Sequence, residues 1–228
     1  MTAPGADSPA LTPALRVEDA TFYNYGRSSA SFRVRIALGL KGLAPREIVD
    51  IDLRAGAQSS MDYRKIAPSG LVPAFDFGAQ SYSQSLALIE WMDAAYPEPR
   101  LIPQDPLRAM AAREISYAIA CDIHPVNNLR ILKYLTGVLG VSENQKNDWY
   151  GHWVRQGFDG VEALLRRRSE DGPYCLGAEV TLADICLVPQ VFNARRFNVD
   201  LTEYPRIVAV DAACNRLPAF SEARPQET

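Results

Sequence analysis

The chain has 228 residues, of which 47% are hydrophobic and 22% are charged, and its formal net charge is −3. This balance is typical of a globular protein, and the weak negative charge gives no reason to expect nucleic acid as a partner. A small anionic ligand remains compatible with it, because a few buried arginines create a positive site inside an acidic protein. No apolar run approaches the roughly 20 residues that cross a bilayer, so we expect no membrane partner.

The cysteines give no sign of a metal site. Cys121, Cys175, Cys186 and Cys214 are far apart and form neither a CxxC motif nor a zinc-binding spacing. We therefore expect free thiols in a reducing compartment, with the cytoplasm as the default location, and no metal. Residues 1–18 lack the basic region and apolar core of a secretory signal. Their Pro, Ala and Ser content predicts a flexible tail.

Residues 19–100 carry the strand and helix signals of a small α/β domain. The segment 20–25 is rich in β-formers and ends at Gly26, and a helical repeat of apolar residues follows and stops at Gly42. The further elements expected are a strand at 47–53, a short helix before Pro68 capped by Ser59 or Ser60, strands at 72–77 and 80–83, and a helix at 86–96. A βαβ unit followed by a hairpin and a helix is the order of a thioredoxin-like domain.

Residues 97–106 are predicted to link this domain to a second one, because the four prolines among them cannot continue a helix. Residues 107–228 are helical in pattern nearly to the end. The clearest helix start is at Thr181, which can cap the backbone while Asp184 reaches back to it. The predicted fold is therefore α/β plus all-α, with a thioredoxin-like domain followed by a helical bundle domain.

The start of the first predicted helix carries two serines, Ser28 and Ser29, between Arg27 and Ala30. A hydroxyl there lies beside free backbone N–H groups at the positive end of the helix dipole. Such surroundings favour a bound thiolate. Taken alone, the simpler interpretation is that one of the serines only caps the helix.

Two further segments complete a ligand pattern. A cis bond between Val72 and Pro73 would turn the Val72 backbone outward to pair with a peptide-like ligand, and a trans proline at a strand edge is the alternative. Gln84 and Ser85 open the third helix, whose N–H groups form a seat for a carboxylate, although capping alone also explains them. A thiol site, a strand edge and a carboxylate seat, in this order, together describe glutathione.

Longer motifs resemble one family. In RSSASFRVRIAL (27–38), QSLALIE (84–90), LIPQDP (101–106) and TLADICLVPQ (181–190), the chain resembles the zeta-class glutathione transferases, which include maleylacetoacetate isomerase. It is similar to bacterial maleylpyruvate isomerases as well, in DIHPVNNLR (122–130) and VDAAC (210–214). The resemblance implies a glutathione transferase fold and a homodimer. Glutathione, as the cofactor, would lie on the first domain and the substrate between the domains.

The resemblance also implies roles for individual residues. Ser28 or Ser29 would hold the glutathione sulfur as a thiolate, with Ser29 preferred. The residues implied for the rest of glutathione are Val72 through its backbone, Gln84 and Ser85 on the γ-glutamyl carboxylate, His124 and Asn128. The residues implied for the substrate carboxylates are Arg27, Arg130 and one of Arg195 and Arg196, with Arg196 favoured. The planar fork of arginine suits this role, because it grips a carboxylate with two hydrogen bonds.

The segment around His124 is expected to be helical, with Asn127 and Asn128 on the same helix face. Pro125 would interrupt the hydrogen bonding of that helix and alter the direction of Arg130.

One departure from the family pattern bears on the reaction. Ala30 stands where the family usually has cysteine, which argues against the mixed-disulfide chemistry of related reductive dehalogenases. The glutathione sulfur alone can still add to a cis double bond conjugated with a carbonyl, permit rotation and leave.

The resemblance therefore implies glutathione-dependent cis–trans isomerisation of a small unsaturated diacid, with maleylacetoacetate preferred. Maleylpyruvate is the nearest alternative substrate. A transferase that conjugates or dehalogenates small electrophiles is a second alternative, and a non-catalytic binding module on the same fold is a third.

Overall fold

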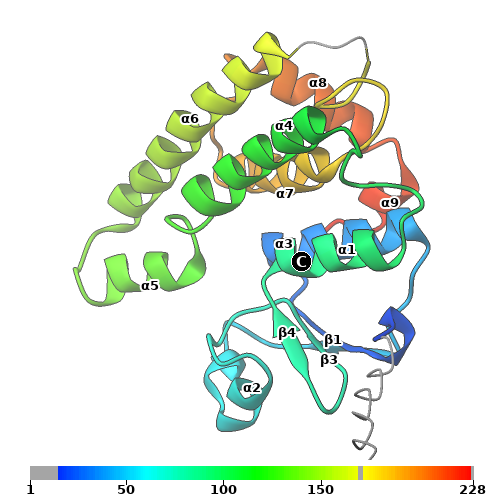
Figure 1. The fold of residues 1–228 in the computed structure, drawn as a ribbon. Helices are drawn as coiled ribbons and strands as arrows, with labels where there is room; N and C mark the ends of the chain where they lie inside the picture. Colours follow the sequence, from blue (N-terminus) through cyan, green and yellow to red (C-terminus); the bar gives the residue numbers. More distant parts are fainter. Residues whose placement is uncertain (1–14, 169–171, 227–228) are drawn as a thin grey trace, which may run out of the picture.

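The computed structural model describes residues 15–168 and 172–226. They form a sheet domain, at the bottom of Figure 1, and a helical domain above it. Most of the predicted tail, residues 1–14, lies outside the described residues. Val17, in the 3-10 helix Val17–Asp19, is fully buried in the core. This residue of the predicted tail therefore packs against the first domain.

The sheet has four strands in the order β2-β1-β3-β4. Their bounds are Thr21–Asn24 for β1, Glu47–Asp50 for β2, Ala74–Asp76 for β3 and Ser81–Ser83 for β4. β1 pairs with β2 in parallel and with β3 antiparallel, and β3 and β4 form an antiparallel hairpin. β3 starts later than predicted, after Pro73, which has no N–H group to offer the ladder. This order confirms the thioredoxin-like prediction.

Helices α1 (Ser29–Lys41) and α3 (Ser85–Ala95) lie over the sheet, and the short α2 (Met61–Ile66) lies beside it (Figure 1). α1 begins at the predicted serines and ends before Gly42. The φ angle of Gly42 is 62°, a left-handed conformation that glycine adopts without steric cost. Of the two predicted candidates, Ser59 and Ser60, it is Ser60 that caps α2.

Helices build the second domain. Their bounds are Pro106–Tyr117 for α4, Ala118–Ile123 for the π-helical turn η3, Leu129–Gly137 for α5, Glu143–Arg167 for α6, Leu182–Arg196 for α7, Pro205–Cys214 for α8 and Pro218–Ser221 for α9. Pro106, the last residue of the predicted linker, is the first residue of α4. The capping box of Thr181 and Asp184 is confirmed. Because α1 packs against α7 and α9 as well as α3, one apolar core runs through both domains.

The chain between α4 and α5 corrects one prediction. His124, Asn127 and Asn128 do not share a helix face, because η3 ends at Ile123 and a turn follows, after which Asn128 caps α5. Pro125 cannot donate a backbone hydrogen bond, so the helical ladder cannot continue through it. The three side chains still line one cavity.

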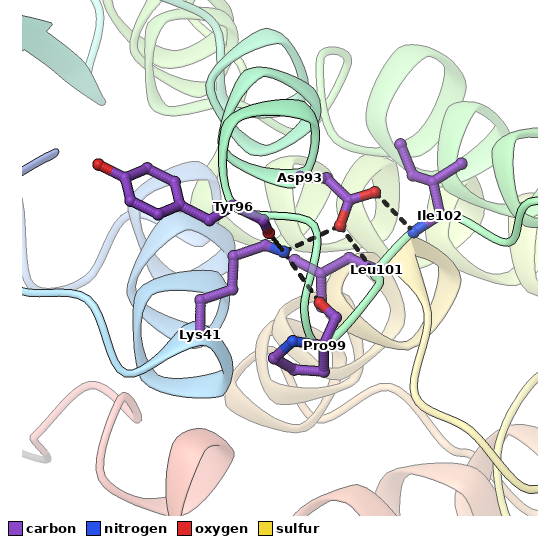
Figure 2. Close-up of polar contacts among 6 residues, drawn as sticks. All are labelled: Lys41, Asp93, Tyr96, Pro99, Leu101 and Ile102. Carbon is purple, nitrogen blue, oxygen red and sulfur yellow. Dashed lines mark hydrogen bonds and ion pairs between the residues drawn. The ribbon is translucent and has the colours of Figure 1, made fainter. Parts of the chain in front are cut away.

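A buried ion pair fixes the linker between the domains (Figure 2). Nζ of Lys41, at the end of α1, lies 2.9 Å from Oδ1 of Asp93 on α3, and the two side chains are 0% and 6% exposed. Lys41 also donates to two backbone carbonyl oxygens, and Asp93 accepts from the N–H groups of Leu101 and Ile102. The carbonyl of Leu101 accepts a 2.7 Å hydrogen bond from Leu182, at the start of α7. The pair thus joins α1, α3, the linker and α7.

The substitution Asp93→Ala is expected to lower the free energy of unfolding by about 3–5 kcal/mol, because it leaves the buried Lys41 charge without its partner. Urea unfolding followed by circular dichroism measures this change. Asp62→Ala is the matched control, since Asp62 pairs with Lys65 at the surface, where their side chains are 92% and 74% exposed. It is expected to leave the unfolding curve unchanged. Equal unfolding midpoints for the two variants would contradict the structural role of the buried pair.

Candidate active site

Two cavities adjoin at the junction of the domains. The first has a volume of about 260 Å³, and we call it the arginine cavity after Arg27, Arg54 and Arg196 in its lining. The second has a volume of about 310 Å³ and includes the start of α3, and we call it the helix-end cavity. The residues that line both cavities are Leu71, Val72, His124 and Asn128. The two cavities therefore form one continuous site.

Ser28 and Ser29 both line the arginine cavity. Ser28 is the N-cap of α1, and its Oγ accepts a 3.2 Å hydrogen bond from the N–H of Ser31. Ser29 is 5% exposed, and its Oγ accepts a hydrogen bond from Nδ2 of Asn193 on α7. Because each oxygen is used as an acceptor, each hydroxyl keeps its proton to donate elsewhere. Helix capping and thiol binding are thus compatible at this position.

The arginine cavity concentrates positive charge. Burial lowers the pKa of Arg196, and the nearby charges of Arg27 and Arg54 lower it further. Arg195 instead points to Asp211, with Nη1 and Oδ2 2.5 Å apart, and is not among the described residues that line this cavity. Of the two candidate arginines on α7, Arg196 is therefore the one that a ligand in the cavity can reach.

The helix-end cavity is lined by Gln84 and Ser85, as expected for the start of α3. Gln84 has a positive φ of 78°, which costs about 1–3 kcal/mol for a residue with a side chain and is common at ligand sites. Oγ of Ser85 accepts a 3.3 Å hydrogen bond from Nη1 of Arg33. Arg33 is 2% exposed, and its Nε and Nη2 have no partner among the described residues. A buried guanidinium in this state favours an anion nearby.

Val72 and His124 lie where the cavities meet. The Val72–Pro73 bond, which the sequence left open, is cis. Neither backbone group of Val72 takes part in the turn, loop or cap hydrogen bonds of the described chain. Burial, followed by the charges of Arg33 and Arg130, lowers the pKa of His124 to about 3. The imidazole is therefore neutral near pH 7 and offers one donor and one acceptor.

Arg130 is placed differently from the expectation. It lines the helix-end cavity with Ala30, and it is not among the described residues that line the arginine cavity. The reason is local: Asn128 accepts from the N–H of Arg130 at 3.1 Å and starts the new helix α5 there. The structure thus brings Arg27 and Arg196 to one cavity and Arg130 to the other.

No role at the site was predicted for Arg54 or for three amides of the arginine cavity. Arg54 lies in a loop and belongs to no motif. The amides are Asn127, which was expected only on the helix face of His124, and Gln190 and Asn193; they are 7%, 1% and 7% exposed. Gln190, Asn193 and Arg196 recur every third residue on α7, and this spacing was a usable signal, because it places side chains on one helix face. The contact of Asn193 with Ser29 could not be predicted from the sequence, because 164 positions separate the two residues.

Among the described residues, no cluster of three or more His, Cys, Asp or Glu side chains is arranged to hold a metal ion. The four cysteines are unpaired. No helix in this part of the chain is long and apolar enough to cross a membrane.

His124 is expected to remain neutral at pH values at which an ordinary histidine becomes protonated. Its pKa falls from 6.5 to about 3 on folding, so the unfolded chain takes up this proton first as the pH falls. The contribution of His124 to stability is therefore complete above pH 6.5 and is lost progressively between there and about pH 3. NMR of the imidazole protons, assigned with His124→Gln, should show no titration between about pH 8 and pH 5. A midpoint near the unfolded value would contradict the partly buried, cationic surroundings of this ring.

Comparison with known proteins places these features in a family. Family models match the glutathione S-transferase N-terminal domain at residues 27–95 and the C-terminal domain at residues 147–212. A probable maleylacetoacetate isomerase of Vibrio cholerae is 45% identical over 205 residues, which cover 90% of this chain and 94% of the relative. The holo structure of a maleylpyruvate isomerase, a bacterial zeta-class glutathione S-transferase, is 47% identical with a TM-score of 0.87 and covers 90% of this chain and 96% of its own.

A third relative was solved with ligands. The maleylacetoacetate isomerase of Methylobacterium extorquens AM1, with bound malonate and glutathione, is 33% identical with a TM-score of 0.83 and covers 90% of this chain and 96% of its own. These similarities extend through both domains and confirm the predicted two-domain fold. The chain belongs to the zeta class of the glutathione S-transferase family.

Proposed function

We propose that this protein is a glutathione-dependent cis–trans isomerase of a small unsaturated diacid. The observation that carries the proposal is the pair of adjoining cavities, one with a carboxylate seat and a buried cation, the other with serine hydroxyls and three arginines. A tripeptide thiol fits the first cavity and a dianion fits the second. The isomerase names of the similar proteins support the same reaction.

The residues of the helix-end cavity fit glutathione. Its γ-glutamyl carboxylate would lie on Gln84 and Ser85, at the start of α3, where the helix dipole and the Arg33 charge both favour an anion. The backbone of Val72 would pair with the cysteinyl part. His124 and Asn128, which line both cavities, would contact the rest of the tripeptide.

Ser29 is the residue we assign to the sulfur, with Ser28 as its neighbour. When bound, glutathione supplies a thiolate whose electron pair adds to the conjugated double bond and is later expelled, so that rotation takes place about a single bond. The hydroxyl proton of Ser29 would donate to this sulfur while Asn193 holds its oxygen. The positive end of the α1 dipole would stabilise the thiolate as well.

The arginines would position the diacid. Arg27 and Arg196, with Arg54 beside them, can each grip a carboxylate with two charge-assisted hydrogen bonds. Holding both ends of the diacid would fix its double bond near Ser29 and remove the cost of aligning the reactants. Arg130 would act on the glutathione side instead, since it lines the helix-end cavity.

We prefer maleylacetoacetate as the substrate and keep maleylpyruvate as the alternative. The similar proteins carry both names, at 45% identity for the first and 47% for the second. Both compounds are dianions with a cis double bond beside a carbonyl, so the same cavity suits either. A cytoplasmic location is part of the proposal, because free cysteines are typical of a reducing compartment.

A conjugating transferase is the second candidate function. Ala30 in the helix-end cavity has no thiol, so dehalogenation through a mixed disulfide has no support here. The charges of the arginine cavity favour a dianion over the neutral electrophiles that a detoxifying enzyme takes. A non-catalytic binding module is weaker still, because hydroxyl donors and cations meet in one site.

We also propose a homodimer that uses α3 and α4. Met110 and Tyr117 are 60% and 40% exposed, and they lie seven residues apart on one face of α4. The Tyr117 hydroxyl donates to Glu90 on α3, so the exposed face includes both helices. Light scattering is expected to give twice the chain mass of 25.2 kDa.

The direct test is isomerisation of freshly prepared maleylacetoacetate and maleylpyruvate, each with and without glutathione. Glutathione-dependent turnover is expected, and the diacid that is converted faster is the substrate we would assign to the protein. No turnover of either, together with conjugation of a general electrophile, would move the protein to the conjugating transferases. Failure to bind immobilised glutathione would favour the non-catalytic module.

Ser29→Ala is expected to lower kcat by about 10²-fold, because a donor to the developing charge is removed. The same variant should raise the pKa of bound glutathione, measured by thiolate absorbance. Ser28→Ala is the comparison, and it should cost about 1 kcal/mol of stability as a lost helix cap while leaving that pKa unchanged. The reverse pattern would assign the sulfur to Ser28, and no change in either variant would contradict both assignments.

Arg196→Ala is expected to raise KM for the diacid by about 10- to 100-fold, since charge-assisted hydrogen bonds contribute about 1.5–3 kcal/mol. Arg195→Ala is the matched control, because Arg195 pairs with Asp211 outside the described lining of the cavity. Steady-state kinetics on both variants decide the assignment. An unchanged KM in Arg196→Ala would remove Arg196 from the substrate site.

A further inference from the structure

The arginine cavity contains a buried amide to which the proposed mechanism gives no role. Gln190 on α7 is 1% exposed, and neither its Nε2 nor its Oε1 has a partner among the described residues. Buried polar groups are nearly always hydrogen-bonded, because an unpartnered one destabilises the fold. Two unpartnered atoms on one cavity-lining side chain therefore point to a ligand group.

The position of Gln190 relates it to the expected chemistry. Gln190, Asn193 and Arg196 follow at three-residue intervals along α7, and all three line the arginine cavity. The helix rises roughly 9 Å from the first to the last of them. Asn193, in the middle, holds Oγ of Ser29, where the sulfur is expected. Along α7, the row therefore begins with the buried amide of Gln190 and passes Asn193 beside the expected sulfur position. It ends at Arg196, which would bind a carboxylate.

The surroundings of Gln190 favour a neutral oxygen over a second carboxylate. Asn127, another buried amide of this cavity, uses its Nδ2 on the carbonyl of Tyr150 at 3.3 Å and leaves its Oδ1 without a partner in the described chain. The arginines provide the charge of the cavity, whereas these two amides provide uncharged donors and acceptors. An uncharged donor suits a carbonyl oxygen, which becomes a stronger acceptor as negative charge develops on it.

We propose that Nε2 of Gln190 donates a hydrogen bond to the carbonyl oxygen that is conjugated with the double bond of the diacid. This inference rests on the proposed function. As the electron pair of the thiolate forms the carbon–sulfur bond, the π pair of the double bond moves toward that oxygen. It returns when the carbon–sulfur bond breaks, so no proton is gained or lost. A donor already fixed at that oxygen stabilises the transition state more than the ground state.

The bent shape of a cis diacid is compatible with this contact. Its two ends can both approach the arginines while the carbonyl near its middle approaches Gln190. The contact also explains why an unpartnered amide would be kept in the core: the substrate carbonyl, by accepting from it, offsets its cost to the free protein.

The first test is a binding ratio measured without turnover. Isothermal calorimetry gives Kd for 4-oxoheptanedioate and for heptanedioate, two saturated seven-carbon diacids that differ only in the central carbonyl. The wild-type protein is expected to prefer the keto diacid, and Gln190→Met is expected to reduce that preference by about tenfold. Val191→Ala is the control, because Val191 is a fully buried neighbour on α7 outside the described lining. It should leave the ratio unchanged.

Kinetics and stability supply the second test. Gln190→Met is expected to lower kcat by about 10²-fold and to raise KM by at most about tenfold, in line with the lost preference for the keto diacid. The same variant should raise the thermal unfolding midpoint, because an apolar side chain of similar shape replaces two unpartnered polar atoms. A merely structural glutamine would give the opposite result, a lower midpoint with kcat/KM preserved.

The outcomes separate this inference from the proposed function. A wild-type protein that isomerises neither diacid contradicts the proposed function, whereas the binding ratio still tests the Gln190 contact. A wild-type protein that isomerises a diacid, with the keto preference and kcat preserved in Gln190→Met, overturns the inference and leaves the proposed function intact.

Discussion

Helix α1 packs against both domains at once, and the site depends on this packing. It contacts α3 within the first domain and α7 and α9 within the second. Its first residue, Ser29, accepts a hydrogen bond from Asn193, and its last residue, Lys41, is buried against Asp93. The serines come from one domain and Arg196 from the other, so neither domain alone assembles the arginine cavity. Through these contacts, α1 fixes the position of one half of the site relative to the other.

The electrostatics of the site indicate what it binds. Arg33 is buried with two nitrogens unpartnered in the described chain, and burial and neighbouring charges lower the pKa of Arg196. Such groups destabilise the free protein, and anions that pair with them stabilise it by mass action. In the proposed function, glutathione and a dicarboxylate would bring carboxylates to both cavities. Binding of these anions would then offset the loss of stability that the site causes in the free protein.

Short-range features could be predicted from sequence, whereas the assembly of the site could not. The helix end at Gly42 and the helix start at Thr181 and Asp184 could be predicted, because caps depend on residues within one turn. The spacing of His124, Asn127 and Asn128 predicted one helix face, whereas the helix ends at Ile123, close to the proline that was expected to interrupt its hydrogen bonding. The resemblance to a family placed the serines and arginines in one site. Contacts such as Asn193 with Ser29 depend on domain packing, which no local pattern encodes.

In the proposed reaction, glutathione is regenerated in each cycle while the arginine cavity holds the diacid. The most direct measurement supplies the preferred diacid in large excess over glutathione and follows trans product and free thiol together. We expect complete conversion, many product molecules per glutathione and an unchanged amount of free thiol. Conversion that stops at one product per glutathione, with an equal loss of free thiol, would contradict it and identify a conjugating enzyme.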